Sequence, residues 1–294
     1  MKMQSQSPFQ LCKVQIEQFH RDGYLILPGF YDLETEIIPI LQGIHEIIGI
    51  LIKKYGLPIA HPAFSPEAFD SGYQALIAYD RKIGGDVYDA VKHLPSFLRL
   101  LSSTKNEQLV QSLRNSSLVG TPAGNYGIRI DNPSEDRFKT FWHQDYPSHF
   151  RSIDGLVLWA PLVPITSDLG PVELLVGSHV EGLARLELRN KNLGQPTSYQ
   201  EVANNYKICQ EESYLEKYPR ISPLSSPGDL VIFDFLLVHQ SGANISSRSR
   251  WSMQFRYFNY HNPLGQKISW AGSLAAGKRI EDTHPEIVHK ENFP

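Results

Sequence analysis

The sequence predicts a mainly β fold with flanking α-helices, whose core is a sandwich or barrel of the jelly-roll kind. Three observations lead to this prediction. Short apolar runs separated by Pro, Gly, Asn and Asp extend from about residue 117 to about residue 260. Before them, apolar residues recur three and four apart, which is typical of helices. Tyr and Phe, which favour strands, occur 14 times each, and 20 Pro residues favour turns.

The pattern predicts a single domain over residues 1–294 with three successive parts. A helical buttress spans about residues 14–116, the β core spans about 117–260, and an irregular tail, 261–294, is expected to pack back on the core. Residues 181–221 are polar and weakly patterned. Loops of that length in compact domains are usually functional or disordered, so we expect an insertion or a lid over one mouth of the barrel.

Apolar periodicity and turn signals place the expected helices and strands. From Leu33 to Leu51 the apolar residues mostly recur three and four apart, which predicts one long helix, and Pro39 marks a kink or the true start of it. The expected helices are Val14–Asp22, Asp32–Tyr55, Asp86–Leu101 and Asn106–Arg114. The expected strands are Gly23–Pro28, Tyr126–Ile130, Lys139–Trp142, Leu156–Leu162, Val172–Val176, Leu230–Leu237 and Trp251–Tyr260.

Composition and charge argue against several classes of protein. With 41% hydrophobic and 20% charged residues the chain is an ordinary globular one, and a net charge of −3 does not favour a nucleic-acid or membrane-surface protein. The N-terminus lacks the apolar region of a signal peptide, and Ile37–Ile52 is too short and too polar for a membrane span. Cys12 and Cys209 do not suggest a disulfide framework. We therefore expect a cytoplasmic protein; nothing in the sequence specifies its oligomeric state.

Two histidines and one aspartate form the strongest chemical pattern. His143 and Asp145 are two residues apart, so on an extended strand end both side chains point to the same side. His239 follows the apolar run after Pro227-Gly-Asp229, at the expected end of a strand. Two His and one carboxylate on one face of an ion form the facial triad of Fe(II) oxygenases, which leaves positions open for co-substrate and O2. An isolated histidine is more often a hydrogen-bonded core residue, but His239 is not isolated.

A strand of alternating character begins shortly after His239. Its even positions from 250 to 256 are polar and its odd positions from 251 to 255 are apolar. If the apolar set packs on the other sheet or on helices, the polar set faces the interior, where polar groups are costly unless they bind a ligand. A guanidinium there suits a dicarboxylate, and Arg250 is the first candidate, with Arg248 and Arg256 at the same parity. The alternative is an ordinary surface face of a strand.

Together, these blocks resemble the phytanoyl-CoA dioxygenase family. The resemblance spans roughly residues 14–260 and implies a double-stranded β-helix, a cupin-like jelly-roll barrel with N-terminal helices against one sheet. The matching blocks are, in order, Phe19–Phe30, His143-Gln-Asp145, Trp159, Gly170–His179, Pro227-Gly-Asp229, His239–Asn244 and Arg250.

The resemblance also implies the cofactors and their binding residues. Fe(II) would be held by His143, Asp145 and His239, which are then the catalytic residues. The co-substrate 2-oxoglutarate would chelate the iron and pair its distal carboxylate with Arg250. The further residues implied for its pocket are Gln144, Trp159, Ser241, Ser252 and Asn125.

The implied reaction oxidises an unactivated C–H bond of a small-molecule metabolite, consumes O2 and releases succinate and CO2. Related halogenases have a small residue in place of Asp145, so the carboxylate here favours hydroxylation, although desaturation, ring closure and epimerisation begin with the same hydrogen abstraction. Polar, basic and aromatic residues near the motif suit a polar or anionic substrate; the alternative for each is a loop residue that contacts solvent. These substrate candidates are Tyr146, His149, Arg151, Tyr126 and Tyr73.

Two other functions are compatible with the same residues. A cupin-like metal-dependent isomerase or lyase would need no 2-oxoglutarate and would tolerate the replacement of Arg250. A catalytically inactive binding module on the same fold would bind no metal at His143, Asp145 and His239.

Overall fold

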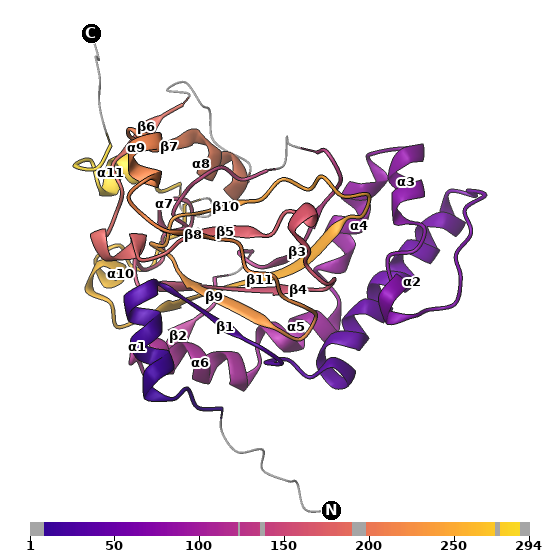
Figure 1. The fold of residues 1–294 in the computed structure, drawn as a ribbon, viewed down its shortest axis with the longest axis horizontal. Coiled ribbons are helices and arrows are strands. Elements are labelled where there is room, and N and C mark those ends of the chain that lie inside the picture. Colours follow the sequence, from indigo (N-terminus) through magenta and orange to yellow (C-terminus); the bar gives the residue numbers. More distant parts are fainter. Residues whose placement is uncertain (1–8, 123, 136–138, 190–197, 274–276, 289–294) are drawn as a thin grey trace, which may run out of the picture.

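The fold consists of two facing antiparallel sheets with helices packed outside them (Figure 1). The computed structural model describes residues 9–122, 124–135, 139–189, 198–273 and 277–288. Within these residues the sheets do not close into a barrel, and helices account for 38% of the described residues. The fold has the expected antiparallel strands with flanking helices, but it is not mainly β and its sheets form no closed barrel. The reason is that the helical first part is large compared with a β core of short strands.

The larger sheet contains six strands: β1 (Tyr24–Leu27), β2 (Val119–Gly120), β3 (Gly127–Asp131), β4 (Gly155–Pro161), β9 (Leu230–Asp234) and β11 (Arg250–Asn259). Their order is β1-β9-β4-β11-β2, and β3 also pairs with β11. Every pair is antiparallel, and the register sets Trp159 of β4 opposite Gln254 of β11 and Val231 of β9. Residues that are opposite each other share a face, so the central strands present one continuous inner surface.

The smaller sheet contains β10 (His239–Ser241), β5 (Val172–Leu175) and β8 (Arg220–Ile221). The sequence suggested that one strand runs from the turn at Pro227 to His239, but the strand in the structure is shorter. Instead β9 ends at Asp234, whose carboxylate accepts from the Leu236 amide at 2.7 Å in a turn, and His239 then begins β10. This turn moves the chain from the larger sheet to the smaller one.

The first part of the chain forms helices α1 (Lys13–Asp22), α2 (Ile38–Lys54), α3 (Tyr73–Tyr79), α4 (Ile83–Val91), α5 (Pro95–Leu101) and α6 (Thr104–Arg114), with a π-helical turn at Leu33–Ile37. Pro39 lies in the first turn of α2 and therefore marks its start rather than a kink. The single helix expected over Asp86–Leu101 is two helices, because Pro95 begins a new one. α3 was not predicted.

The segment Leu33–Lys54 is long and apolar enough to cross a membrane by length and composition. In this fold it is a core helix, since Ile40, Ile44 and Ile48 are fully buried and α2 contacts α4 and α5.

Regular structure occurs in residues 181–221, where a long insertion was expected. The structure has there the paired strands β6 (Leu186–Leu188) and β7 (Tyr206–Ile208), α8 (Tyr199–Asn205) and α9 (Glu211–Leu215), while residues 190–197 lie outside the described part. Asn204 of α8 donates to the Lys139 carbonyl at 3.2 Å and accepts from the Phe141 amide at 3.3 Å. The insertion therefore lies beside the segment that leads to His143.

The tail adds α10 (Pro263–Lys267) and α11 (Ile280–Thr283). In the part of the chain that the structure describes, short 3-10 turns occur at Pro66–Ala68, Ser167–Leu169 and Ser178–Glu181. The Leu186 amide donates to the Ile287 carbonyl at 2.7 Å, so the described part of the tail packs against the insertion.

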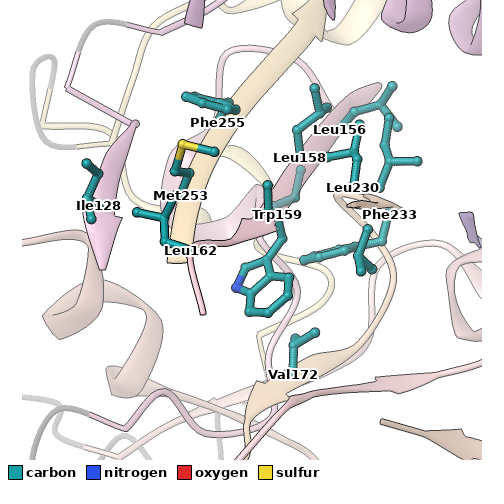
Figure 2. Packing of buried hydrophobic residues seen from close by; sticks show 14 of the residues in the cluster. Ile128, Leu156, Leu158, Trp159, Leu162, Val172, Leu230, Phe233, Met253 and Phe255 are labelled. Carbon is teal, nitrogen blue, oxygen red and sulfur yellow. The ribbon is translucent and has the colours of Figure 1, made fainter. Parts of the chain in front are cut away.

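The apolar interior links the two sheets. Figure 2 shows the indole of Trp159 extending from β4 toward Val172 of β5 in the smaller sheet. Val157, which faces the same side of β4 as Trp159, is 1% exposed, and Phe233 is 2% exposed. The contact between the sheets is therefore apolar at these residues.

The alternation predicted for β11 is present. Its odd residues pack on the helical side: Trp251 makes edge contacts with Phe69 and Tyr73, and Phe255 stacks on Phe97 of α5 with ring centroids 5.3 Å apart. Its even residues face the interior between the sheets, and three of them line a cavity there: Arg250, Gln254 and Arg256. β11 therefore packs on the helices with one face and lines the cavity between the sheets with the other.

Replacement of Phe255 by alanine should therefore destabilise the protein strongly. Phe255 is fully buried, and deletion of a buried Phe leaves a cavity that costs about 3–5 kcal/mol in the free energy of unfolding. Urea denaturation measures this change. Val14→Ala is the control, because Val14 is 70% exposed and its replacement should change the value by less than about 0.5 kcal/mol. Equal losses in both variants would contradict the role given to β11.

Candidate metal centre and its two cavities

A short backbone bridge sets the positions of the two histidines. The His143 amide donates to the His239 carbonyl at 3.0 Å, and the His239 amide donates to the His143 carbonyl at 3.0 Å. The two residues are therefore directly opposite each other, and their ring centroids lie 4.2 Å apart. The strand expected at Lys139–Trp142 is absent; only this bridge at His143 pairs in the β manner.

Asp145 lies next to the two histidines, but it precedes a helix and does not lie at the extended strand end that was expected. It precedes the short helix α7 (Tyr146–His149) with helical backbone angles, and its amide donates to the Phe235 carbonyl at 2.9 Å. Its Oδ1 atom lies 3.3 Å from Nε2 of His143 and 3.8 Å from Nε2 of His239. The ligand atoms of the three residues all lie within 4.8 Å of one another, so the turn into a helix, rather than an extended strand end, completes the cluster.

Backbone carbonyls orient both imidazoles. Nδ1 of His143 lies 2.7 Å from the Phe141 carbonyl, and Nδ1 of His239 lies 2.9 Å from the Leu237 carbonyl. A carbonyl only accepts, so each Nδ1 carries the proton and each Nε2 presents its lone pair to the centre. Burial, together with the nearby His143, lowers the pKa of His239 to about 3. The His239 ring is thus neutral at ordinary pH, as a metal ligand must be.

Asp145 is held as a carboxylate by its neighbours. Its burial alone would raise its pKa, but the charge of Arg256 together with His149 and His143 outweighs burial and holds the pKa well below its usual value. Arg256 donates from Nε to Asp145 Oδ2 at 2.7 Å, and Nε2 of His149 lies 3.5 Å from Oδ1. Arg256 therefore holds one carboxylate oxygen and leaves the other facing the histidines.

Two cavities meet at this centre. His239 lines only the smaller cavity, Asp145 lines only the larger one, and His143 lines both. The larger cavity has a volume of about 650 Å³, which is within the range of small-molecule binding sites. An ion held by the three ligands would face both spaces.

Two arginines, Arg129 and Arg250, line the smaller cavity together with the histidines, and both pair with Asp131. Arg129 pairs with both oxygens of Asp131 at 2.8 and 2.9 Å, and Arg250 donates from Nη2 to Asp131 at 2.8 Å. Burial opposes ionisation of Asp131, but the two guanidinium groups lower its pKa to about 2. Arg250 is 2% exposed, and its Nε and Nη1 are buried with no hydrogen-bond partner among the described residues. Two cations against one carboxylate leave a net positive charge here.

Most of the co-substrate residues implied by the resemblance line these cavities. Trp159 and Ser241 line the smaller cavity and Asn125 lines the larger one. Ser252 shares the inward parity of Arg250, and its buried Oγ has no partner among the described residues. Gln144 lies elsewhere: its amide group bonds to backbone atoms of Gly182, Ala184 and Leu236, so its side chain joins loops and lines neither cavity.

The five substrate candidates divide into two groups. Tyr73, Tyr126 and His149 line the larger cavity. Tyr146 turns away, and its hydroxyl lies 3.0 Å from Nε2 of His284 in the tail. Arg151 also turns to the tail and donates to the Trp270 carbonyl at 2.9 Å.

Sequence reasoning missed several charged and aromatic residues of the cavities. Arg129 and Asp131 have the inward parity of β3, opposite Ser252 and Arg250 of β11, and that parity was the available signal. Tyr88 lies in α4 and Lys92 directly follows it. Nothing in the sequence pattern indicated that this side of the helix would line a cavity next to the candidate metal centre.

The centre should bind a divalent transition metal through all three ligands. We expect His143→Ala and Asp145→Ala each to weaken Mn(II) binding by more than about 100-fold, since even groups that only orient a ligand contribute about 10–100-fold to metal affinity. Equilibrium dialysis with metal analysis measures this loss. The control is His20→Ala, which removes an exposed histidine of α1 and should leave binding unchanged. Unchanged binding in the Asp145 variant would contradict the ligand set.

Comparison with known proteins adds a family and a fold. The sequence model of the phytanoyl-CoA dioxygenase (PhyH) family matches residues 19–252 of this chain. The chain is similar to the non-heme alpha ketoglutarate dependent carbocyclase SnoK from nogalamycin biosynthesis, with a TM-score of 0.55 and 18% identity over 86% of this chain and 88% of that one. It is also similar to EctD from S. alaskensis with bound Fe, with a TM-score of 0.52 and 17% identity over 89% and 80% of the two chains.

A second EctD structure, with 2-oxoglutarate and 5-hydroxyectoine, gives a TM-score of 0.51 at 16% identity over 89% of this chain and 80% of that one. No curated protein matches the sequence. Identities this low establish a shared fold, whereas the family match extends over most of the 294 residues and includes both motif histidines and the aspartate. The chain therefore belongs to the phytanoyl-CoA dioxygenase (PhyH) family.

Proposed function

We propose that this chain is an Fe(II)- and 2-oxoglutarate-dependent dioxygenase that hydroxylates an unactivated C–H bond of a small-molecule metabolite and releases succinate and CO2. The smaller cavity is the observation that supports this proposal most strongly. Its lining includes the two metal-ligand histidines together with the incompletely paired, buried Arg250. A compact dicarboxylate that binds a metal at one end fits this arrangement of charge.

The residues present fit an Fe(II) ion. His143, Asp145 and His239 supply two neutral nitrogens and one anionic oxygen on one side of a point, which is the ligand set of non-haem Fe(II) oxygenases. The opposite side faces the cavities, where a co-substrate and O2 would bind. Iron with O2 and 2-oxoglutarate would supply an oxidant for a C–H bond, which no side chain can provide.

The residues also fit 2-oxoglutarate. Arg250 would donate from Nη1 to the distal carboxylate, because its Nη2 is already used by Asp131. Ser252, on the same face of β11, would add a hydroxyl donor. Apolar walls exclude water along the smaller cavity and strengthen these charge-assisted bonds; they are formed by Val157, Trp159, Val172 and Phe233.

Substrate would enter from the larger cavity, which reaches the centre at His143 and Asp145. The protein would hold the target carbon near the iron and exclude water, and these tasks of orientation supply much of the rate enhancement in such a site. The insertion contributes Ser198 and Ala203 to the cavity wall, which supports the proposal that it covers the mouth.

Hydroxylation is the outcome that the ligand set favours. Asp145 fills the position that a halide would need, so halogenation is disfavoured. The similar structures are of SnoK, described as a carbocyclase, and of EctD with 5-hydroxyectoine, so this fold accommodates more than one oxidative outcome. An isomerase or lyase without 2-oxoglutarate would leave the buried, partly unpaired Arg250 without a use.

Arg250→Ala should raise the 2-oxoglutarate concentration needed for half-maximal succinate formation by about 10–100-fold. A hydrogen bond to a charged group contributes about 1.5–3 kcal/mol, and each 1.4 kcal/mol is about a tenfold change in affinity. The measurement is iron-dependent succinate release from 2-oxoglutarate. The fold should persist, because Asp131 keeps both bonds to Arg129.

Arg248→Ala is the matched control. Arg248 precedes the same strand, but it pairs with Asp70 at 3.1 Å and lines neither cavity. Its replacement should leave the 2-oxoglutarate dependence unchanged. If the Arg250 variant behaves like the native protein, the arginine does not bind the co-substrate, and the isomerase alternative gains support.

A further inference from the structure

The larger cavity has one wall that the proposed reaction does not explain. Helix α4 presents one face to it: Gly84, Gly85 and Tyr88, with Lys92 directly after the helix. Gly84 and Gly85 lie four and three residues before Tyr88, and Lys92 lies four residues after it, so they share one side with Tyr88. The adjoining side of the helix, at Ile83, Val87 and Val91, is buried, and α4 contacts α2. Figure 1 shows α4 beside β3, whereas the metal ligands come from β10 and the turn before α7.

Gly85 keeps part of this wall open. A glycine inside a helix destabilises it relative to alanine, so its presence calls for a reason. Gly84 has a packing reason, because an added Cβ would lie 2.5 Å from Nη1 of Arg81 and 2.9 Å from Ile77. At Gly85 an added Cβ would meet nothing within 4 Å. Gly85 is exposed and lines the larger cavity, so its missing side chain leaves open space at the cavity wall rather than room for a neighbouring residue.

Lys92 is the most loosely held cation of the cavity wall. The three arginines of the wall are bound to carboxylates that are themselves mostly buried: Arg81 to Glu135, Arg129 to Asp131 and Arg256 to Asp145. Lys92 instead pairs at 2.6 Å with Asp89, whose side chain is 71% exposed. An exposed ion pair of this kind is weak, so an anionic ligand can share or replace Asp89 as the partner of Lys92.

An aromatic surface adjoins this cation. The Lys92 ammonium lies 5.5 Å from the centroid of the Tyr88 ring, and Tyr88 is 46% exposed. An exposed ring one helical turn before a cation offers a flat apolar contact next to a charge. Tyr126 lines the same cavity.

We propose that the substrate of this site is an organic acid with a planar apolar body: its carboxylate pairs with Lys92, and its body lies against Tyr88 in the space left by Gly85. This inference rests on the proposed function, because the same cavity leads to the candidate metal centre. It assigns the α4 face, Gly85–Lys92, as the element that selects the substrate.

The test uses the complete protein loaded with Fe(II) and 2-oxoglutarate under anaerobic conditions, with two probes of equal shape. Calorimetric titration compares 2-naphthoate with 2-naphthamide, and saturating 2-oxoglutarate keeps both probes away from Arg250. We expect the acid to bind about 10-fold more tightly than the amide, as a charge-assisted bond in a partly buried site allows. Equal binding of acid and amide, or no binding of the acid, would overturn the proposal.

Two variants locate the effect. Lys92→Gln should weaken 2-naphthoate binding about 10-fold, to the level of the amide, and leave the amide unaffected. Gly85→Leu should weaken both probes about 10-fold by filling the space, without loss of helix stability, since leucine favours helices. Lys13→Gln, at an exposed pair with Glu17 on α1, is the matched control and should change neither. An unchanged acid affinity in the Lys92 variant would also overturn the proposal.

Failure of this inference is separable from failure of the proposed function. Iron-dependent succinate release by the native protein tests the function without any of these probes. If succinate is released but acid and amide bind equally, only the substrate class is wrong. If no succinate is released, the proposed function is wrong and the substrate class falls with it.

Discussion

The reciprocal backbone bridge between His143 and His239 is the constraint on which the site depends. It joins the segment before α7 to the smaller sheet and sets the two imidazoles next to each other, with ring centroids 4.2 Å apart and ring planes tilted by 49°. The Asp145 backbone N–H then donates a hydrogen bond to the Phe235 carbonyl, in the turn that leaves the larger sheet. This bond places the Asp145 carboxylate beside the two histidine rings. Buried backbone N–H and C=O groups nearly always need hydrogen-bond partners. Meeting this need through the bonds of His143 with His239 and of Asp145 with Phe235 brings the three ligands together from two distant parts of the chain.

Charge balance explains how so many ionised groups can be buried together. Each buried carboxylate of the interior has an arginine partner: Arg256 holds Asp145, and Arg129 with Arg250 holds Asp131. Breaking either set would leave an uncompensated buried charge, which is strongly destabilising. The remaining excess of positive charge at Arg250 suits a bound dianion. The same cluster therefore stabilises the interior and prepares it for a co-substrate.

Sequence reasoning predicted the chemistry better than the architecture. The alternation of β11 identified the inward arginines, because a strand with one apolar face has a period that is visible in sequence. The strand at Lys139–Trp142 and the single helix at Asp86–Leu101 were wrong, since tertiary hydrogen bonds and Pro95 decided those segments. The sequence could not place Gln144 or the α4 face, because their roles depend on loops and helices that meet only in the folded chain. These positions follow from long-range packing rather than from local pattern.

The central claim is that one buried centre binds iron and 2-oxoglutarate together. The most direct measurement is an anaerobic titration of the metal-free protein with Fe(II) and then with 2-oxoglutarate, followed by visible absorption. A metal-to-ligand charge-transfer band should appear only after the second addition, and it should be lost in His239→Ala, which removes one of the three ligands. If iron binds and no band appears, 2-oxoglutarate does not chelate the metal, and the account of the smaller cavity is contradicted.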